Sequence, residues 1–319
     1  MSPAFEFDVC ILGAGRVGLP LGLALLDVGL SVVGVDLDGT LREAVNAGRM
    51  PFREPGFEAL VAQRRLQVHA TPEVAARSRA IVITVGTPLH THIETDLRQI
   101  RRAIDGLLPH LREGQLICLR STVAPGTTAV VRDQLERGTD LRVGETLGLA
   151  YCPERIAEGK AREELRTLPQ IVGAQDALSA NAAATLFARL APEVLPCDWI
   201  TAELVKLSNN IVRYVHFAVA NQMALVADTF GADIHKVRAL ANHGYPRNLL
   251  ASPGLTAGTC LRKDFGMISE WCPYPDLLLA AWKMNEAMPA FLVRHLEQRA
   301  PLRGARVAVL GYTFKRDTD

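Results

Sequence analysis

The sequence predicts an α/β fold: a doubly wound parallel sheet, then an all-helical middle domain, then the stub of a second α/β domain. Three observations support this prediction. Short β-rich runs alternate with amphipathic helical stretches in the first half, the pattern of βαβ units. A glycine-rich turn follows the first run. The alternation of β-rich runs and helical stretches then ends, and a long stretch without proline or glycine follows at residues 199–230.

The predicted strands are short and apolar, as expected where helices cover both faces of a parallel sheet. The strands are expected at residues 7–12, 31–36, 80–85, 115–120 and 147–152. The helices between them are expected to include residues 17–28, 96–108 and 127–135. We therefore assign a first domain to residues 1–196.

Residues 199–230 carry apolar side chains at helical spacing and predict one long helix. Because it is longer than an average helix, we expect it to span between domains or to form a homodimer interface. A loop rich in proline and glycine and two more helical stretches complete a middle domain at residues 197–300. The apolar run 305–310 then predicts a new buried strand, so residues 301–319 are expected to begin a truncated third domain.

Composition and charge exclude several classes of protein. The formal net charge is +1 and the basic residues are dispersed, so nucleic acid is not an expected partner. No apolar run has transmembrane length and no targeting segment precedes the first strand, which predicts a cytoplasmic protein without membrane contact. The 6 cysteines form no CxxC pair, which favours reduced thiols over disulfides and predicts no metal site.

The segment Gly13-Ala14-Gly15-Arg16-Val17-Gly18 follows a strand and opens a helix, as in a Rossmann-like dinucleotide site. Gly13 makes the tight turn, Gly15 lets a pyrophosphate approach the backbone, and Gly18 lets the helix pack on the strand. The helix N-terminus then faces the phosphates. Asp36 ends the next strand, where a carboxylate binds ribose hydroxyls and repels a 2′-phosphate, so NAD is favoured over NADP. A domain that binds FAD or no cofactor is the alternative.

Polar residues gather where two later strands end, in residues 120–126 and 151–159. Ligands of doubly wound sheets bind outside the carboxyl ends of the strands. We therefore expect Thr122, Glu154 and Glu158 to face one crevice.

The second half holds two further polar groups. Lys206 and Asn210 are four residues apart and share one face of the long helix, where a solvated stripe is the alternative. Cys260 follows a loop and precedes a helix, a position that lowers the pKa of a thiol, and Asp264 lies one turn further on. The other five cysteines are interpreted as small buried hydrophobic residues.

Together these segments resemble the UDP-glucose / UDP-N-acetylmannosamine dehydrogenase family over essentially the whole chain. Each motif is modest alone, whereas their order and spacing are specific. The motifs are Gly13 to Gly18, Val85-Gly86-Thr87-Pro88, Ser121-Thr122-Val123, Pro153-Glu154 with Glu158, Glu203 to Asn210, Tyr245-Pro246-Arg247, Pro253 to Asp264, and Leu310-Gly311-Tyr312-Thr313-Phe314-Lys315.

The resemblance implies an NAD-dependent, four-electron oxidation of the C6 hydroxymethyl group of a nucleotide-sugar to a uronic acid. Cys260 would attack the aldehyde to give a thiohemiacetal, which is oxidised to a thioester and then hydrolysed. Lys206 and Asn210 would stabilise the oxyanion. Glu154 would act as the acid/base or activate water, while Asp264 and Thr122 would position the water.

The resemblance also implies two sets of binding residues. The NAD set is Gly13, Gly15, Arg16, Val17, Gly18, Asp36, Val85, Gly86, Thr87, Pro88, Ser121, Thr122 and Glu158. The set for a nucleotide-sugar, expected to be UDP-linked, is Glu154, Arg155, Lys206, Asn210, Arg247, Gly254, Ala257 and Lys315. A homodimer through residues 199–230 is expected, in which the loop at 251–257 reaches a neighbouring subunit.

Departures from the family pattern refine this interpretation. Ala257-Gly258 replaces a Gly-Gly pair. Arg155, in place of phenylalanine, favours the acetylamino-sugar branch, as do Arg213 and residues 168–173. The family continues past Asp319 into a domain that covers the nucleotide, so these residues are expected to bind NAD but turn over poorly or not at all.

Two alternatives remain open. One is a two-electron hydroxyacid dehydrogenase of the 6-phosphogluconate type, against which Cys260 argues because that reaction needs no thiol. The other is a catalytically inactive, NAD-binding dimerisation module.

Overall fold

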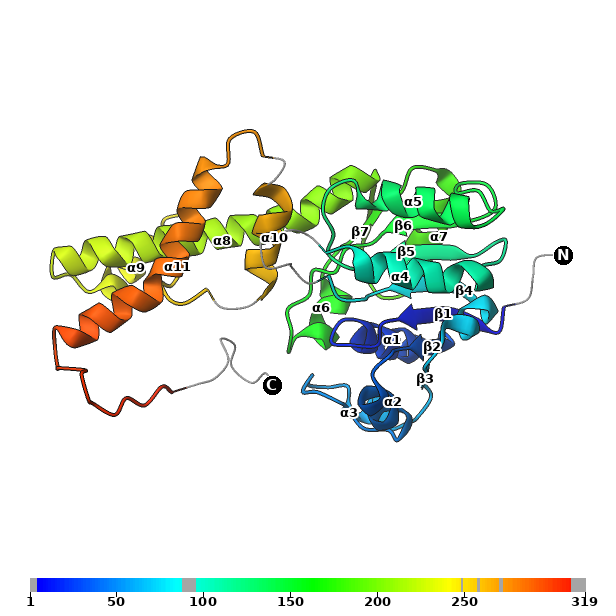
Figure 1. Cartoon of the computed structure of the whole chain (residues 1–319), viewed down its shortest axis with the longest axis horizontal. Helices are drawn as coiled ribbons and strands as arrows, with labels where there is room; N and C mark the ends of the chain where they lie inside the picture. Colours follow the sequence, from blue (N-terminus) through cyan, green and yellow to red (C-terminus); the bar gives the residue numbers. More distant parts are fainter. Residues whose placement is uncertain (1–4, 88–95, 248, 257–258, 270–271, 311–319) are drawn as a thin grey trace. The chain divides into compact units, whose positions relative to one another are not determined.

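The computed structural model describes residues 5–87, 96–247, 249–256, 259–269 and 272–310 (Figure 1). The chain forms two compact units, one that ends at Lys206 and one that begins at Leu207. These two residues are neighbours within one helix, α8 (Trp199–Thr229). Each unit is described by itself below.

The first unit is a doubly wound α/β layer structure. Over the described residues its sheet has 8 strands in the order β3-β2-β1-β4-β5-β6-β7-β8. Neighbouring strands run parallel except β6 and β7, which meet antiparallel at Tyr151 and Gly173. The strands are β1 (Phe7–Leu12), β2 (Val32–Val35), β3 (Gln67–His69), β4 (Ser78–Ile83), β5 (Leu116–Leu119), β6 (Gly148–Tyr151), β7 (Gln170–Gly173) and β8 (Val194–Cys197).

Helices cover both faces of this sheet. The crossover helices are α1 (Gly18–Asp27), α2 (Gly39–Asn46), α3 (Glu58–Val61), η1 (Pro72–Arg77), α4 (Arg98–Leu107), η2 (Leu108–His110), α5 (Thr127–Gly138), α6 (Ala161–Thr167) and α7 (Ala177–Phe187). Alternate residues of β1 divide between two cores: Val9 and Ile11 pack towards α1, α6 and α7, whereas Cys10 and Leu12 pack towards α4 and α5. The buried side chains Trp199 and Ala202 add the start of α8 to the second core.

The five strands expected from the sequence are confirmed, β1 with the predicted bounds. The pattern missed β3, β7 and β8. All three are short, and β8 is an edge strand that contains Pro196 and leaves its two central residues exposed. Proline and exposure remove the continuous apolar run by which a buried strand is recognised.

The described part of the second unit contains helices and no strand. After α8 come α9 (Ile234–Asn242), α10 (Thr259–Ser269) and α11 (Asp276–Glu297), which continues through Pro289. The rings of Tyr214 on α8 and Phe265 on α10 lie 6.2 Å apart. His295 of α11 lies 3.2 Å from Asp228 of α8. The long helix expected at 199–230 is confirmed and ends at Thr229.

One local expectation is wrong. Residues 305–310, predicted as a buried strand, have no regular secondary structure, and Val307, Val309 and Leu310 are exposed. A strand is stable only where its backbone groups pair with a neighbour and its side chains are covered, and among the described residues no strand pairs with this segment. Residues 311–319 lie outside the described residues, so the third domain remains a prediction.

Candidate functional site

The glycine-rich turn between β1 and α1 has three differently constrained glycines. Gly13 has a φ of 98°, and its carbonyl accepts a hydrogen bond of 2.6 Å from Thr84 Oγ1. A Cβ on Gly18 would lie 2.0 Å from the Gly13 oxygen, so only glycine fits there. A Cβ on Gly15 would meet no atom within 4 Å, so this backbone is open to a ligand. A tight turn, a close helix–strand contact and an open backbone at a helix N-terminus fit the pyrophosphate of NAD.

Asp36 stands directly after β2 and is held by its neighbours. Its backbone N–H donates to the His69 carbonyl at 3.0 Å, and its carbonyl accepts from Arg42 at 2.9 Å. Its Oδ1 accepts from the Asp38 N–H at 2.9 Å. The carboxylate is therefore oriented at the end of the strand next to the glycine turn, where the adenosine ribose of NAD would bind.

Two other residues assigned to NAD touch each other in the structure. Arg16 Nη1 lies 2.7 Å from Glu158 Oε1, and the Arg16 guanidinium lies 5.1 Å from the centre of the Phe52 ring. Both charged side chains are partly exposed, so solvent weakens the pair.

The loops after β4 and β5 are joined by hydrogen bonds. Thr87 Oγ1 donates to the Thr122 carbonyl at 2.7 Å, and Ser121 Oγ donates to the Val85 carbonyl at 2.7 Å. Four residues that the sequence assigned to the cofactor site therefore lie together at the carboxyl ends of neighbouring strands. Pro88 lies outside the described residues.

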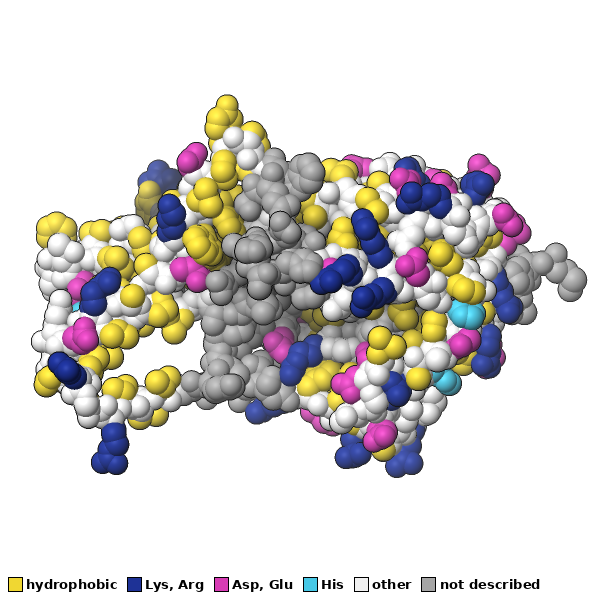
Figure 2. All heavy atoms as spheres, in the orientation of Figure 1, with side chains coloured by type: hydrophobic (Ala, Val, Ile, Leu, Met, Phe, Trp, Pro, Cys, Tyr) yellow, Lys and Arg dark blue, Asp and Glu magenta, His cyan; other side chains and the backbone are white. Residues whose placement is uncertain are grey.

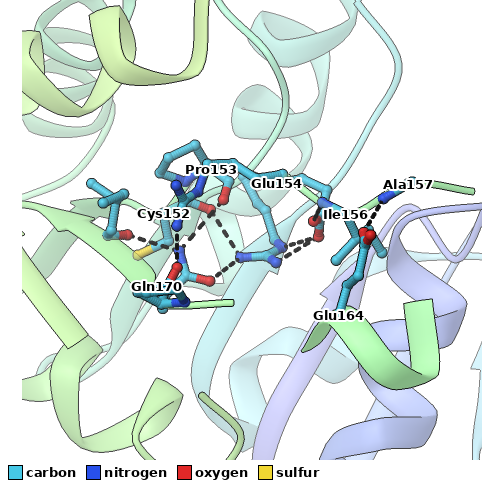
Figure 3. A network of polar contacts seen from close by, with 11 residues as sticks. Cys152, Pro153, Glu154, Ile156, Ala157, Glu164 and Gln170 are labelled. Atoms are coloured by element: carbon cyan, nitrogen blue, oxygen red, sulfur yellow. Dashed lines mark hydrogen bonds and ion pairs between the residues drawn. The ribbon is translucent and has the colours of Figure 1, made fainter. Parts of the chain in front are cut away.

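Glu154 lies in a buried network after β6 (Figure 3). Its Oε2 accepts from Arg120 Nε at 2.8 Å and Nη2 at 2.5 Å, while its Oε1 accepts from the Ile156 N–H at 2.7 Å. Arg120 Nη1 also donates to the Cys152 carbonyl at 3.1 Å and to Gln170 Oε1 at 2.9 Å. Both charges are almost fully buried, and buried charges are tolerated only when paired in this way.

Sequence reasoning assigned Glu154 and gave Arg120 no role. A usable signal was present, because an arginine directly after a fully buried strand needs a carboxylate nearby. Arg120, Glu154 and Gln170 also line a small cavity of about 20 Å³, room for a single water molecule. Arg155 lines it too and donates to the Pro169 carbonyl, and burial lowers the pKa of its guanidinium.

Glu203 ties the first turns of α8 to the N-terminus of α5. Its carboxylate is fully buried and accepts from the Gly126 N–H at 2.6 Å, the Thr128 N–H at 2.8 Å and Thr128 Oγ1 at 2.6 Å. Burial raises the pKa of Glu203, against the lowering effect of the bonds from Thr128 and Gly126. Lys206, partly buried, stands one turn further along α8. Glu203 belongs to a family motif in the sequence analysis, which gives it no function. In the structure it links the first turn of α8 to the N-terminus of α5.

In the second unit, Asn210 of α8 donates through Nδ2 to Asp264 Oδ2 at 2.5 Å. Cys260 is the second residue of α10, as the sequence predicted, and Asp264 follows one turn later. Two residues assigned to catalysis from distant segments are therefore in contact. Arg247 donates to the Tyr245 hydroxyl at 2.9 Å.

Ala257 and Lys315 lie outside the described residues. That Cys260, Asn210 and Asp264 act together with Thr122, Glu154 and Lys206 is part of the function proposed below.

Two negative findings concern the described residues alone. None of their helices is both long and apolar enough to cross a membrane. Among the same residues, His, Cys, Asp and Glu side chains form no group of three or more that could hold a metal ion.

Known proteins match this chain along most of its length. The model of the UDP-glucose/GDP-mannose dehydrogenase family, NAD binding domain, matches residues 7–191, and the central-domain model of the same family matches residues 200–287. The UDP-N-acetyl-D-mannosamine dehydrogenase of Pyrococcus horikoshii is 32% identical over 98% of this chain and 77% of its own length. The NDP-N-acetyl-D-galactosaminuronic acid dehydrogenase of Ralstonia nicotianae is 29% identical over 100% of this chain and 79% of its own.

The solved structure of UDP-D-ManNAc dehydrogenase from Pyrococcus horikoshii superposes with a TM-score of 0.87 at 32% identity. The match covers 91% of this chain and 72% of that one. The likeness therefore extends from the sheet into the helical unit.

Proposed function

Since the chain belongs to the UDP-glucose/GDP-mannose dehydrogenase family, we propose that it oxidises the C6 hydroxymethyl group of a nucleotide-sugar to a uronic acid with two NAD⁺. The nucleotide-binding turn and Asp36 hold the cofactor. The reaction consumes one water and releases two NADH and three protons for each alcohol converted to a carboxylate. Bound NAD⁺ supplies the hydride acceptor for each of the two oxidations.

The remaining chemistry belongs to the chain's own residues. After the first hydride leaves, the Cys260 thiolate adds to the aldehyde carbon and the oxygen takes a proton, giving a thiohemiacetal. Loss of that proton and a second hydride gives a thioester. Water then adds to the thioester carbon, and the C–S bond breaks to release the carboxylate and the thiol. Lys206 and Asn210 stabilise the negative oxygen, and Glu154 handles the protons with water positioned by Thr122 and Asp264.

The observation that carries this proposal is the 2.5 Å hydrogen bond between Asn210 and Asp264. It fixes the oxyanion-stabilising amide of α8 against the same helix that begins with Thr259 and Cys260. A thiol at a helix N-terminus is stabilised as thiolate by the unsatisfied backbone N–H groups. A two-electron hydroxyacid dehydrogenase needs no thiol nucleophile at this position.

For the substrate, we propose a UDP-linked 2-acetamido sugar. The relatives of Pyrococcus horikoshii and Ralstonia nicotianae are both named for N-acetylated sugars. The sequence favours the same branch through Arg155 and Arg213. Turnover across a panel of UDP-linked acetamido and hydroxyl sugars tests the assignment, which is wrong if UDP-glucose is the best substrate.

We also propose a homodimer formed through α8. Its described residues leave Val212, Val219, Met223 and Val226 exposed, with spacings of 7, 4 and 3 along the helix. This spacing places them in one stripe, as in helices that pair. Hydrophobic side chains also lie open to solvent over the helical unit in Figure 2. We place the enzyme in the cytoplasm, where its cysteines stay reduced.

Because residues 1–319 alone are expected to turn over poorly or not at all, the decisive experiment counts NADH released per sugar by the protein extended past Asp319 with the family's third domain. We expect about two for the unaltered protein and one for Cys260→Ala, which can form the aldehyde but no thioester. Cys260→Ser should stall after the aldehyde or at a slowly hydrolysed ester. Two NADH per sugar at undiminished rate from Cys260→Ala would refute covalent catalysis, and one from the unaltered protein would favour the two-electron alternative.

Thiol reactivity provides a test that needs no turnover. Burial raises the pKa of Cys10 to about 12, and a hydrogen bond with Cys152 together with burial raises that of Cys118. Burial also raises the pKa of Cys197. We expect an alkylating agent near neutral pH to modify Cys260 first, located by mass spectrometry. Earlier modification of Cys197 or Cys272 would show that the nucleophile is misassigned.

A further inference from the structure

Residues 250–254, in the loop before α10, are held at both ends by asparagine side chains. Leu250 donates its N–H to Asn242 Oδ1 at 2.8 Å and accepts from Asn242 Nδ2 at 2.9 Å. The N–H of Gly254 donates to Asn221 Oδ1 at 2.8 Å. Because Asn242 ends α9 and Asn221 belongs to α8, two helices fix the backbone of one loop.

The bond to Gly254 is the end of a buried chain of hydrogen bonds. Asn221 Nδ2 donates to Asn285 Oδ1 at 2.9 Å, and Asn285 Nδ2 donates to the Tyr214 carbonyl at 3.1 Å. Asn221 is 0% exposed and Asn285 is 3% exposed. Amides this deeply buried are costly unless they are hydrogen-bonded, so the pair is constrained to this geometry.

The two end groups of this hydrogen-bond chain determine the direction in which its bonds donate. The Gly254 N–H can only donate and the Tyr214 carbonyl can only accept. Both amides must therefore point the same way, each accepting on the Gly254 side and donating on the Tyr214 side. A carboxylate at either position has no N–H to donate, so it would place two oxygens against each other. The sequence alone gave no role to either asparagine.

Resting on the function proposed above, we propose that Asn221 and Asn285 are positioning residues that hold the Gly254 loop ready for the nucleotide-sugar. A buried apolar pair of similar size would join α8 to α11 at least as well, because buried polar groups add little net stability. What an apolar pair could not do is hold the Gly254 amide. The loop it holds contains Gly254, assigned to substrate binding, and runs on towards Thr259 and Cys260 of α10.

A loop held in its binding conformation lowers the ordering entropy that substrate binding must overcome. Releasing it should weaken nucleotide-sugar binding more than it affects the cofactor. We expect Asn221→Leu to raise KM for the nucleotide-sugar about tenfold with KM for NAD changed less than about twofold. Asn285→Leu should act in the same direction, and the double variant should cost no more than the larger single one.

The test combines these kinetics, measured on the protein extended with the family's third domain, with hydrogen exchange of the loop in the 319-residue chain. In Asn221→Leu the amide of Gly254 should exchange at least about tenfold faster, while amides of the sheet stay unchanged. Asn221→Asp keeps an acceptor for the Gly254 N–H and loses only the donor to Asn285, so its Gly254 amide should exchange more slowly than that of Asn221→Leu. Gly254 exchange in Asn221→Leu at the rate of the unaltered protein would overturn the inference.

Met288→Ala is the matched control. Met288 is 3% exposed on α11, the helix of Asn285, so truncating it loosens the packing of the same helix while leaving the hydrogen bonds of Asn221, Asn285 and Gly254 in place. If Met288→Ala and Asn221→Leu had equal effects on loop exchange and on KM, the asparagines would only stabilise the helical unit in general. The positioning role would then be wrong.

The two proposals fail in different ways. If the unaltered protein, extended with the family's third domain, neither binds nor oxidises any nucleotide-sugar, the proposed function fails, while faster Gly254 exchange in Asn221→Leu would still show that the loop is held. If the unaltered protein turns over normally and Asn221→Leu has the same KM and the same loop exchange, only the positioning role is wrong.

Discussion

Three charged side chains that the described part of the fold buries, Arg120, Glu154 and Glu203, have specific partners. Arg120 meets Glu154 and two further oxygens, from Cys152 and Gln170. Glu203 accepts from two backbone N–H groups and a hydroxyl. Removing one partner of such a set leaves a buried charge uncompensated, so these contacts constrain the local geometry.

Cofactor choice depends on one carboxylate. We expect the protein to bind NAD more tightly than NADP, because Asp36 accepts from ribose hydroxyls and repels a 2′-phosphate. Asp36→Asn should weaken NAD binding by about tenfold or more, because it removes a charged hydrogen bond. The difference in affinity between NAD and NADP should become smaller. Calorimetry with both nucleotides measures this, and Asp133→Asn, an exposed carboxylate of α5, is the control. Equal affinity of the unaltered protein for NADP would contradict the assignment.

Glu203 should give stability a distinct pH dependence. Its folded pKa is raised by burial, so the folded state binds the proton more tightly than the unfolded state does. Its contribution to stability is therefore largest below the ordinary carboxyl pKa and declines as the pH rises through the raised value. Glu203→Gln, which sets an amide against backbone N–H groups, should cost about 1–3 kcal/mol at acid pH.

That cost should shrink as the pH rises from about 4 to about 7, the range above the ordinary carboxyl pKa. Denaturant unfolding of both proteins at each pH measures the difference. A cost that grows with pH would mean that the hydrogen bonds outweigh burial and lower the pKa instead.

At the scale of elements, two glycines of the β1–α1 turn have different roles: Gly18 is required for the fold, and Gly15 is proposed to be required for NAD binding. Gly18→Ala would place a methyl group 2.0 Å from the Gly13 carbonyl and 2.5 Å from Thr84 Oγ1, so we expect a large loss of stability. Gly15→Ala meets no protein atom and should melt within about 2 °C of the unaltered protein, a surface-like effect. Its methyl group lies where the pyrophosphate approaches, so NAD affinity should fall at least about tenfold.

Melting curves and calorimetry on the two variants decide this point. Normal NAD binding by Gly15→Ala would show that the pyrophosphate does not lie over this turn.

Another element, α8, carries several residues of the proposed function along one continuous helix. Glu203 anchors it to α5, Lys206 and Asn210 follow at one-turn intervals, and Asn221 reaches the Gly254 loop. A helix repeats its faces every 3.6 residues, so one element presents several functional side chains in a fixed order.

At the scale of the whole molecule, the exposed stripe of α8 predicts self-association. Val219→Glu combined with Met223→Glu should raise the dimer dissociation constant at least about tenfold, because burying the charges opposes association. Sedimentation velocity over a range of concentrations measures it. Val130→Glu, an equally apolar site on α5 that is 38% exposed, should leave association unchanged. A monomeric unaltered protein would remove the dimer proposal.

The sequence by itself determined the features that depend on local pattern. Short stretches of sequence are enough to recognise the glycine fingerprint, the five main strands, the long helix and the position of Cys260 at a helix start. Such windows are informative because glycine conformation, strand alternation and helical period act between near neighbours. The same dependence on local pattern explains two errors. β8 with Pro196 was missed because it lacks a continuous apolar run, and residues 305–310 were predicted as a strand because they have one, although no strand among the described residues pairs with them.

Only the tertiary structure decided which polar groups meet. Arg120 and Glu154 are 34 residues apart, Thr128 and Glu203 are 75 apart, and Asn221 and Gly254 are 33 apart. No local window contains both members of such a pair. Their contact follows from the order of the strands and from helix packing, which bring distant segments together, and from the cost of burying a charge or an amide without a partner.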